Sequence, residues 1–323
     1  MLKTSRFIKI LIILIFGGLL YYQLTKGEGI EAVSTIWNKQ KYNLQLTYIL
    51  LVIILTPFNW WLEALKWQKL MSPHQHINIK NSVHTILAGV AAGLVTPARI
   101  GEYAGRLITS DPSRKTQVIS ATLLGSISQN LCNIVGGLIF SYYFLKSVFL
   151  VTYHDHLTFI TIVTLQVGCL VGLYYNLPKV AHFIERRAGN RFILKYSSKL
   201  KSLDLYNTSI LNSVLAISAS RYIVYFLQYI FIMKFLGLDH SFSELGGNIA
   251  GIYLIQTGIP LPAFLSIFAR GEIAVIVWSG LGIDKFIALA ATFGLWLINL
   301  ILPALIGTVI LYKTDINKYL NSK

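Results

Sequence analysis

The feature that most constrains this chain is a set of six uninterrupted apolar runs, each close to the length that crosses a bilayer. They cover Phe7–Leu24, Leu44–Leu62, Gln117–Leu145, Leu157–Leu177, Ile210–Leu236 and Phe286–Tyr312. A helix needs about 20 apolar residues to span the hydrocarbon core, where helical hydrogen bonding satisfies every backbone group. Hydrophobic residues make up 54% of the chain and charged residues 13%, which excludes an ordinary soluble protein. The sequence therefore predicts an all-α polytopic membrane protein with about six full transmembrane helices in one integral membrane domain, residues 1–323.

Two further apolar stretches, Val83–Leu107 and Leu245–Ile283, are interrupted by proline. Pro97 breaks the first stretch, and Pro260 and Pro262 break the second. Proline lacks the backbone N–H that a helix interior requires, so each stretch is expected to form two shorter helices. We therefore predict two proline-broken, re-entrant hairpins in addition to the full spans.

The distribution of basic residues favours this hairpin topology. If each hairpin enters and leaves on one face, a single side of the membrane carries 19 of the 28 basic residues and the other side carries 5. Cytoplasmic loops are enriched in Lys and Arg, so the basic side is expected to be cytoplasmic, with both termini there. We accordingly expect a multi-pass protein of the cell inner (cytoplasmic) membrane. The net charge of +15 is then explained by the basic cytoplasmic loops and does not imply a nucleic-acid partner.

The two hairpins would enter the membrane from opposite faces, which is the pattern of an inverted repeat. The predicted organisation is an N-terminal anchor helix with an outer loop (1–43), a first repeat unit (44–145), a connecting helix with a basic cytoplasmic loop (146–209), a second repeat unit (210–312) and a cytoplasmic tail (313–323). Binding sites of transporters with this symmetry lie between the repeats, near the bilayer midplane.

Charged residues at membrane depth mark the candidate site. In the first hairpin, Thr96 followed by Pro97 predicts the start of a new helix at Pro97. The residues at i, i+3, i+4 and i+7 on one face of that helix are Arg99, Glu102, Tyr103 and Arg106. Charged side chains in lipid are costly, so they usually face a water-filled cavity or one another. The alternatives are an Arg99–Glu102 pair that only pins the hairpin, and an Arg106 that reaches the interface.

The second hairpin has a similar pair, Arg270 and Glu272, after its prolines, and Arg221 lies deep within another apolar run. A guanidinium group stays charged when it is poorly hydrated and can bind a phosphate through two parallel hydrogen bonds. Arg99, Arg221 and Arg270 are therefore candidates to bind an anionic headgroup.

The sequence predicts neither a metal site nor a cofactor. The short His74–His76 and His154–His156 segments have the wrong spacing for a helical metal site, and no nucleotide-binding or hydrolase motif occurs. We expect a protein that is not an enzyme and has no catalytic residues.

The chain resembles the lysylphosphatidylglycerol synthase transmembrane region, or flippase-like, family. The resemblance rests on Thr96–Glu102 followed by Arg106, and on Pro262 with Arg270–Glu272 before Ser279–Gly282. It implies movement between leaflets of a phospholipid or lipid-linked sugar, such as an aminoacylated phosphatidylglycerol. Family members that make aminoacyl lipids carry a further soluble synthase domain, and this chain ends without one, so we expect no synthesis.

The expected function is thus a lipid translocase in which Arg99 and Arg270 hold the head phosphate, while Glu102 and Glu272 balance charge or bind an amine. One alternative is a non-catalytic membrane partner of a lipid-modifying enzyme. Another is an intramembrane lipid-phosphate transferase with Glu102 or Glu272 as general base. The sequence leaves open the lipid, the direction and energy source of transport, and the oligomeric state.

Overall fold

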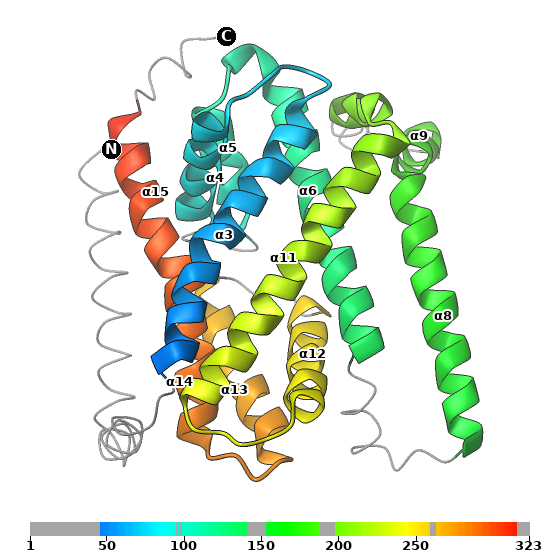
Figure 1. Ribbon diagram of the computed structural model, residues 1–323. Coiled ribbons are helices and arrows are strands. Elements are labelled where there is room, and N and C mark those ends of the chain that lie inside the picture. The colour runs from blue at the N-terminus through cyan, green and yellow to red at the C-terminus, as the bar shows by residue number, and fades with distance from the viewer. Residues whose placement is uncertain are drawn as a thin grey trace.

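The computed structural model describes residues 46–94, 96, 99–140, 153–187, 198–258 and 263–314. All regular structure in these ranges is helical (Figure 1). Five helical segments are long and apolar enough to cross a membrane, and they match five of the six predicted spans. These segments are Leu46–Met71, Pro112–Phe140, Leu157–Tyr175, Thr208–Phe235 and Lys285–Lys313. The sixth predicted span, Phe7–Leu24, lies outside the described residues, as do Pro97, Pro260 and Pro262. The chain is a multi-pass membrane protein.

The described part of the chain contains long helices and shorter helical segments. In chain order they are α3 (Leu46–Met71), α4 (Ile79–Leu94), α5 (Gly101–Ile108), η2 (Pro112–Arg114), α6 (Lys115–Phe140), α8 (Tyr153–Tyr175), α9 (Leu177–Arg187), η3 (Ser198–Leu205), α11 (Thr208–Phe235), α12 (Phe242–Gly258), α13 (Ala263–Ser279), α14 (Lys285–Trp296), η4 (Leu297–Ile301) and α15 (Leu302–Lys313).

Two pairs of shorter helices occupy opposite halves of the bundle. Figure 1 shows α4 and α5 in the half that contains α9, and α12 and α13 in the other half. The long helices α3 and α11 cross and pack along each other between the two pairs. α4 also packs against α15, and α12 packs against α6, so the first helix of each pair contacts the last long helix of the opposite half of the chain.

Glycine permits the close approach of α4 and α5. A Cβ atom on Gly101 would lie 2.1 Å from the carbonyl oxygen of Ala92, and one on Gly105 would lie 2.4 Å from that of Ala88. Only glycine fits at such separations, because real Cβ atoms do not come this near to a backbone oxygen. The short helices are therefore held together by backbone contact, which fixes the position of the charged residues on α5.

Pro97, where the sequence predicts the start of a helix, lies outside the described residues. The regular helix α5 begins at Gly101. The Gly101 N–H donates a hydrogen bond to the Thr96 side-chain oxygen at 2.7 Å, so Thr96 provides a partner for the first backbone N–H of α5. Arg99 precedes the helix and has a φ of +57°, in the left-handed region. A non-glycine residue rarely adopts this conformation, so the surrounding turn holds Arg99 in a strained position.

A π-helical turn, η4, joins α14 to α15 and carries Asn299. Pro303, in the first turn of α15, cannot donate the backbone hydrogen bond that a regular helix would direct back to residue 299. Such turns are frequent at functional sites, where the extra residue redirects a side chain.

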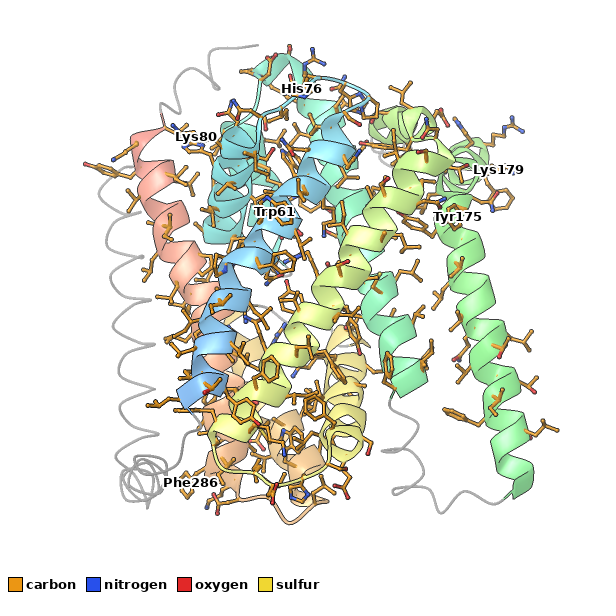
Figure 2. The ribbon with its side chains drawn as sticks, in the orientation of Figure 1. Trp61, His76, Lys80, Tyr175, Lys179 and Phe286 are labelled. Atoms are coloured by element: carbon orange, nitrogen blue, oxygen red, sulfur yellow. The ribbon has the colours of Figure 1, made fainter. Side chains whose placement is uncertain are left out.

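Lys80 and Lys179 belong to segments that the sequence predicts on the basic side of the membrane, and both lie at the end of the bundle that contains α9 (Figure 2). Phe286 lies at the opposite end.

Candidate functional site

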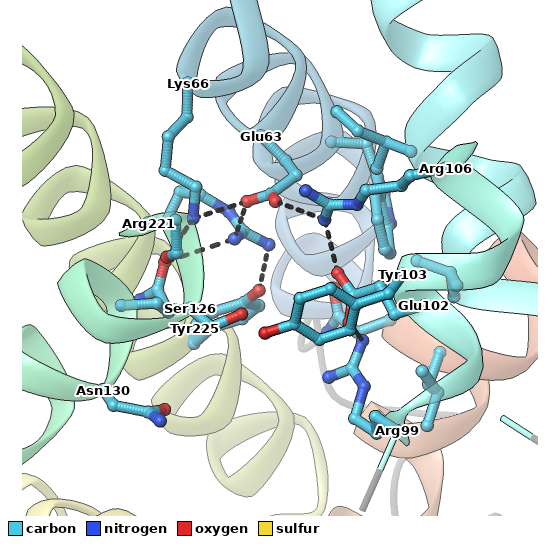
Figure 3. Close-up of a pocket in the computed structure, with 17 residues that line it drawn as sticks. Glu63, Lys66, Arg99, Glu102, Tyr103, Arg106, Ser126, Asn130, Arg221 and Tyr225 are labelled. Atoms are coloured by element: carbon cyan, nitrogen blue, oxygen red, sulfur yellow. Dashed lines mark hydrogen bonds and ion pairs between the residues drawn. The ribbon is translucent and has the colours of Figure 1, made fainter. Parts of the chain in front are cut away.

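A buried carboxylate, Glu63 on α3, lies at the centre of the site (Figure 3). One of its oxygens accepts from Arg106 on α5 at 3.2 Å. The other is paired with Lys66 at 2.7 Å and with Arg221 on α11. All four side chains are less than 10% exposed. A single carboxylate therefore joins three cations from three helices in a place that water hardly reaches.

A second carboxylate, Glu102 on α5, extends this network toward Arg99. Its two oxygens pair separately, one with Arg106 and the other with Arg99 at 3.2 Å. The Arg99 side chain is 52% exposed, in contrast to the buried Arg106. The network of ion pairs thus extends from the buried Glu63 to the half-exposed guanidinium group of Arg99.

Neutral polar groups complete the surroundings of Arg221. Its Nε donates to Asn59 at 3.0 Å, one of its terminal nitrogens donates to Gln129 at 3.2 Å, and the other donates to the Tyr225 hydroxyl. The Arg221 guanidinium carbon also lies 5.2 Å from the centre of the Tyr225 ring, within cation–π range. These contacts fix the position of Arg221 between α3, α6 and α11.

The network borders a cavity of about 330 Å³, defined here as the inner cavity. Its ionic lining consists of four cations, Lys66, Arg99, Arg106 and Arg221, and two carboxylates, Glu63 and Glu102. The cations of this described lining outnumber the carboxylates by four to two. A lining with excess positive charge suits an anion, because guanidinium and ammonium groups form strong charge-assisted hydrogen bonds with anionic oxygens.

A second cavity of about 370 Å³, the aromatic cavity, adjoins the first. Its lining contains Tyr225, Tyr229, Tyr253, Arg99 and Arg270, together with several amides, and no carboxylate. Both cavities are bordered by the same six residues: Arg99, Gln129, Asn130, Tyr225, Asn299 and Leu300. The two spaces are therefore neighbours, and Arg99 faces both.

The structure brings most of the predicted site residues together. Arg99, Glu102, Tyr103, Arg106 and Arg221 line the inner cavity, and Arg270 lines the aromatic cavity.

Glu272 differs from the other predicted residues, since it is exposed and lines neither cavity. It lies two residues from Arg270 on α13, so the two side chains point in different directions from the helix. The expected Arg270–Glu272 pair is not among the ion pairs of the described residues.

Sequence reasoning missed Glu63 and Lys66. The predicted span ended at Leu62 and assigned both residues to a cytoplasmic segment, but α3 continues to Met71 and buries them. The available signal was the continued apolar character beyond them at Trp67 and Leu70, which are fully buried. An i, i+3 ion pair within an apolar helix is itself a sign of charges placed inside a bundle.

No group of three or more His, Cys, Asp or Glu residues suited to a metal ion occurs within the part of the chain that the structure describes. The described linings of the two cavities contain guanidinium, ammonium, carboxylate, amide and phenol groups. Such groups can bind, orient and neutralise an anion.

Comparison with known proteins places the chain in a family. The curated proteins contain no match to it. The family model described as "Lysylphosphatidylglycerol synthase TM region" matches residues 6–307, which includes every helix of the site. This agrees with the resemblance carried by the residues around Thr96 and Arg270, and it associates the protein with lipid modification or translocation. The chain belongs to the lysylphosphatidylglycerol synthase TM region family.

Proposed function

We propose that this protein moves a phosphate-bearing lipid headgroup between the two leaflets of the cytoplasmic membrane. The adjoining inner and aromatic cavities carry this proposal, because they bring arginines from both halves of the chain into one polar space within a membrane domain. A headgroup that crosses the bilayer needs such a space, since polar groups are expensive in hydrocarbon.

The packing of the helices supports an inverted repeat. α3, α4, α5 and α6 form one unit, and α11 to α15 form the other. The first helices of the units contact each other, and each short pair contacts the last helix of the opposite unit, as a twofold relation requires. We therefore infer that α4–α5 and α12–α13 are re-entrant hairpins that enter from opposite faces. Alternating access would then arise when one unit moves against the other around the cavities.

The electrostatics favour an anionic headgroup. The two cavities together are lined by five cationic side chains and two carboxylates. Arg270 makes no ion pair or hydrogen bond with any other residue that the structure describes, and it lines the aromatic cavity together with Arg99. A phosphate bound between Arg99 and Arg270 would accept hydrogen bonds from both guanidinium groups.

We infer the membrane orientation from the enrichment of Lys and Arg in cytoplasmic loops. The end with Lys80 and Lys179 is assigned to the cytoplasm, where Lys and Arg are enriched in loops. α9 carries Lys179, Arg186 and Arg187 beside apolar residues, which suits a position along the anionic inner leaflet.

The test is translocation of labelled lipids by the purified protein in liposomes, with Arg99→Ala and Arg270→Ala as site variants. Lys80→Ala is the matched control, because it removes an exposed cation that borders neither cavity. We expect the site variants to reduce the translocation rate at least tenfold and the control to leave it unchanged. Equal rates for all variants, or no transport by a folded protein, would overturn the proposal and favour a partner of a lipid-modifying enzyme.

A further inference from the structure

The lining of the aromatic cavity bears on which headgroup the site accepts, an inference that rests on the proposed function. The side chains of Asn130, Gln256 and Arg270 border this cavity and make no hydrogen bond with another residue that the structure describes. An amide offers two donors and two acceptor positions, and a guanidinium offers donors alone. The polar groups left for a ligand are therefore neutral or positively charged.

The carboxylates of the site are already engaged. Glu63 is paired with Lys66, Arg106 and Arg221, and Glu102 is paired with Arg99 and Arg106. A cationic headgroup, such as an aminoacyl ester with a free ammonium, would have to displace one of these cations to find a counter-ion. It would also meet repulsion from Arg99 and Arg270, which is poorly screened within a membrane domain.

The tyrosines favour a different group. Tyr225, Tyr229 and Tyr253 present aromatic rings to the aromatic cavity. Their hydroxyls are engaged within the protein, because Tyr229 bonds Thr292 at 2.8 Å and Tyr253 donates to the Tyr225 carbonyl at 3.1 Å. Tyr229 is buried, whereas Tyr225 and Tyr253 are partly exposed, so these two side chains supply the aromatic surface that a ligand can contact. The C–H faces of a sugar ring pack on such surfaces, while its hydroxyls suit the free amides.

An aromatic lining can also attract an ammonium group through cation–π contact. Here the Arg221 guanidinium already lies 5.2 Å from the Tyr225 ring centre, and no carboxylate borders the cavity to assist. The positive charge of the cavity lining therefore disfavours the binding of an ammonium group against the tyrosine rings.

We infer that the two cavities together form a binding site for a glycosyl phosphate headgroup, with the phosphate between Arg99 and Arg270 and the sugar against the tyrosines, Asn130 and Gln256. The site discriminates against aminoacylated, cationic headgroups of the same lipid.

The test compares three short-chain lipids that share a phosphate and differ in the headgroup: dihexanoyl phosphatidylglucose, dihexanoyl phosphatidylglycerol and its lysyl ester. Binding to the full chain in phosphatidylcholine nanodiscs is measured by calorimetry. We expect phosphatidylglucose to bind roughly tenfold more tightly than the lysyl ester, because one or two charge repulsions are avoided and amide hydrogen bonds are gained. Equal or tighter binding of the lysyl ester would overturn the inference.

Variants of lining residues test whether the headgroup preference arises in the aromatic cavity. Asn130→Leu and Gln256→Leu should bring the affinity for phosphatidylglucose close to that for phosphatidylglycerol. Gln166→Leu, an exposed amide on α8 outside both cavities, is the matched control and should change nothing. Asn130→Asp supplies a free carboxylate and should raise the relative affinity for the lysyl ester. Unchanged affinity ratios in all three cavity variants would contradict the assignment.

Two further measurements distinguish a failure of this inference from a failure of the proposed function. Glycerophosphoglucose, the deacylated form, keeps the same phosphodiester and sugar without lipid chains, and binding as tight as that of phosphatidylglucose would exclude a lipid ligand. Translocation of the three lipids in liposomes is measured in parallel. Arg99-dependent transport with a preference for the lysyl ester would overturn the glycosyl assignment and leave the translocase intact. A glycosyl preference in binding without any transport would retain the assignment and refute the translocase.

Discussion

Replacement of Glu63 by glutamine tests the proposed organisation of the site most directly. The change keeps the shape of the side chain and removes the negative charge that joins Lys66, Arg106 and Arg221. Removing one partner of a buried ion pair costs about 3–5 kcal/mol, because the remaining charge stays buried without a counter-ion. Arg106 retains Glu102, and Arg221 retains its neutral hydrogen-bond partners, so the loss should not exceed this range.

The assay is thermal unfolding of the purified protein in detergent. For a chain of this length, a loss of 3–5 kcal/mol lowers the Tm by on the order of 5 °C. Glu102→Gln is the matched comparison and should cost less, because one of its partners, Arg99, is half exposed and can be hydrated.

A double variant provides the control for the electrostatic cause. Lys66→Met removes a buried cation, so it should partly restore the stability of Glu63→Gln, and the coupling between the two changes should be about 1–3 kcal/mol. A Tm of Glu63→Gln equal to that of the unchanged protein, or strictly additive effects in the double variant, would refute the assignment of Glu63 as the shared counter-ion.

Three further predictions concern the scaffold. Gly105→Ala would place a Cβ 2.4 Å from the Ala88 carbonyl oxygen, so α4 and α5 must separate, with a loss of about 1–3 kcal/mol that thermal unfolding would detect as a lower Tm. Burial and the neighbouring Arg114 lower the pKa of His74 below 6.5. The unfolded state therefore binds more protons in acid, the Tm should fall as the pH drops below about 6.5, and His74→Gln should reduce this dependence; an unchanged pH profile would contradict it. Asn207 accepts from the Ile210 N–H at 3.0 Å at the start of α11, so Asn207→Ala should cost about 1 kcal/mol, whereas an unchanged Tm would show that the cap is dispensable.

Length and composition were sufficient to predict the helical membrane fold, since few other structures accommodate such long apolar runs. The charges on α5 were also identifiable, because Arg99, Glu102 and Arg106 interrupt an apolar stretch at helical spacing. Their pairing with Glu63 was not, because local spacing carries no information on which distant helix a side chain meets. Glu63 and Arg221 are 158 residues apart.

The error at Glu63 has a physical cause. A criterion based on apolar length ends a span at its first charges, and Glu63 and Lys66 come directly after Leu62. In the folded protein these charges neutralise each other at 2.7 Å and face two arginines, so the helix can continue at low cost. Paired charges are therefore compatible with a span, whereas isolated ones are not.

The opposite error at Glu272 shows the limit of an argument from symmetry. The sequence suggested that each proline-interrupted stretch supplies an arginine and a carboxylate, but only the first stretch, with Arg99 and Glu102, places both in a cavity. As a result, no carboxylate occurs among the described residues that line the aromatic cavity with Arg270. A cluster that served stability alone would gain from balancing its charges, because every uncompensated cation at membrane depth carries a desolvation cost. The excess of cations over carboxylates around Arg99 and Arg270 is therefore better explained by an anion that enters the site from outside the chain than by a role in holding the helices together.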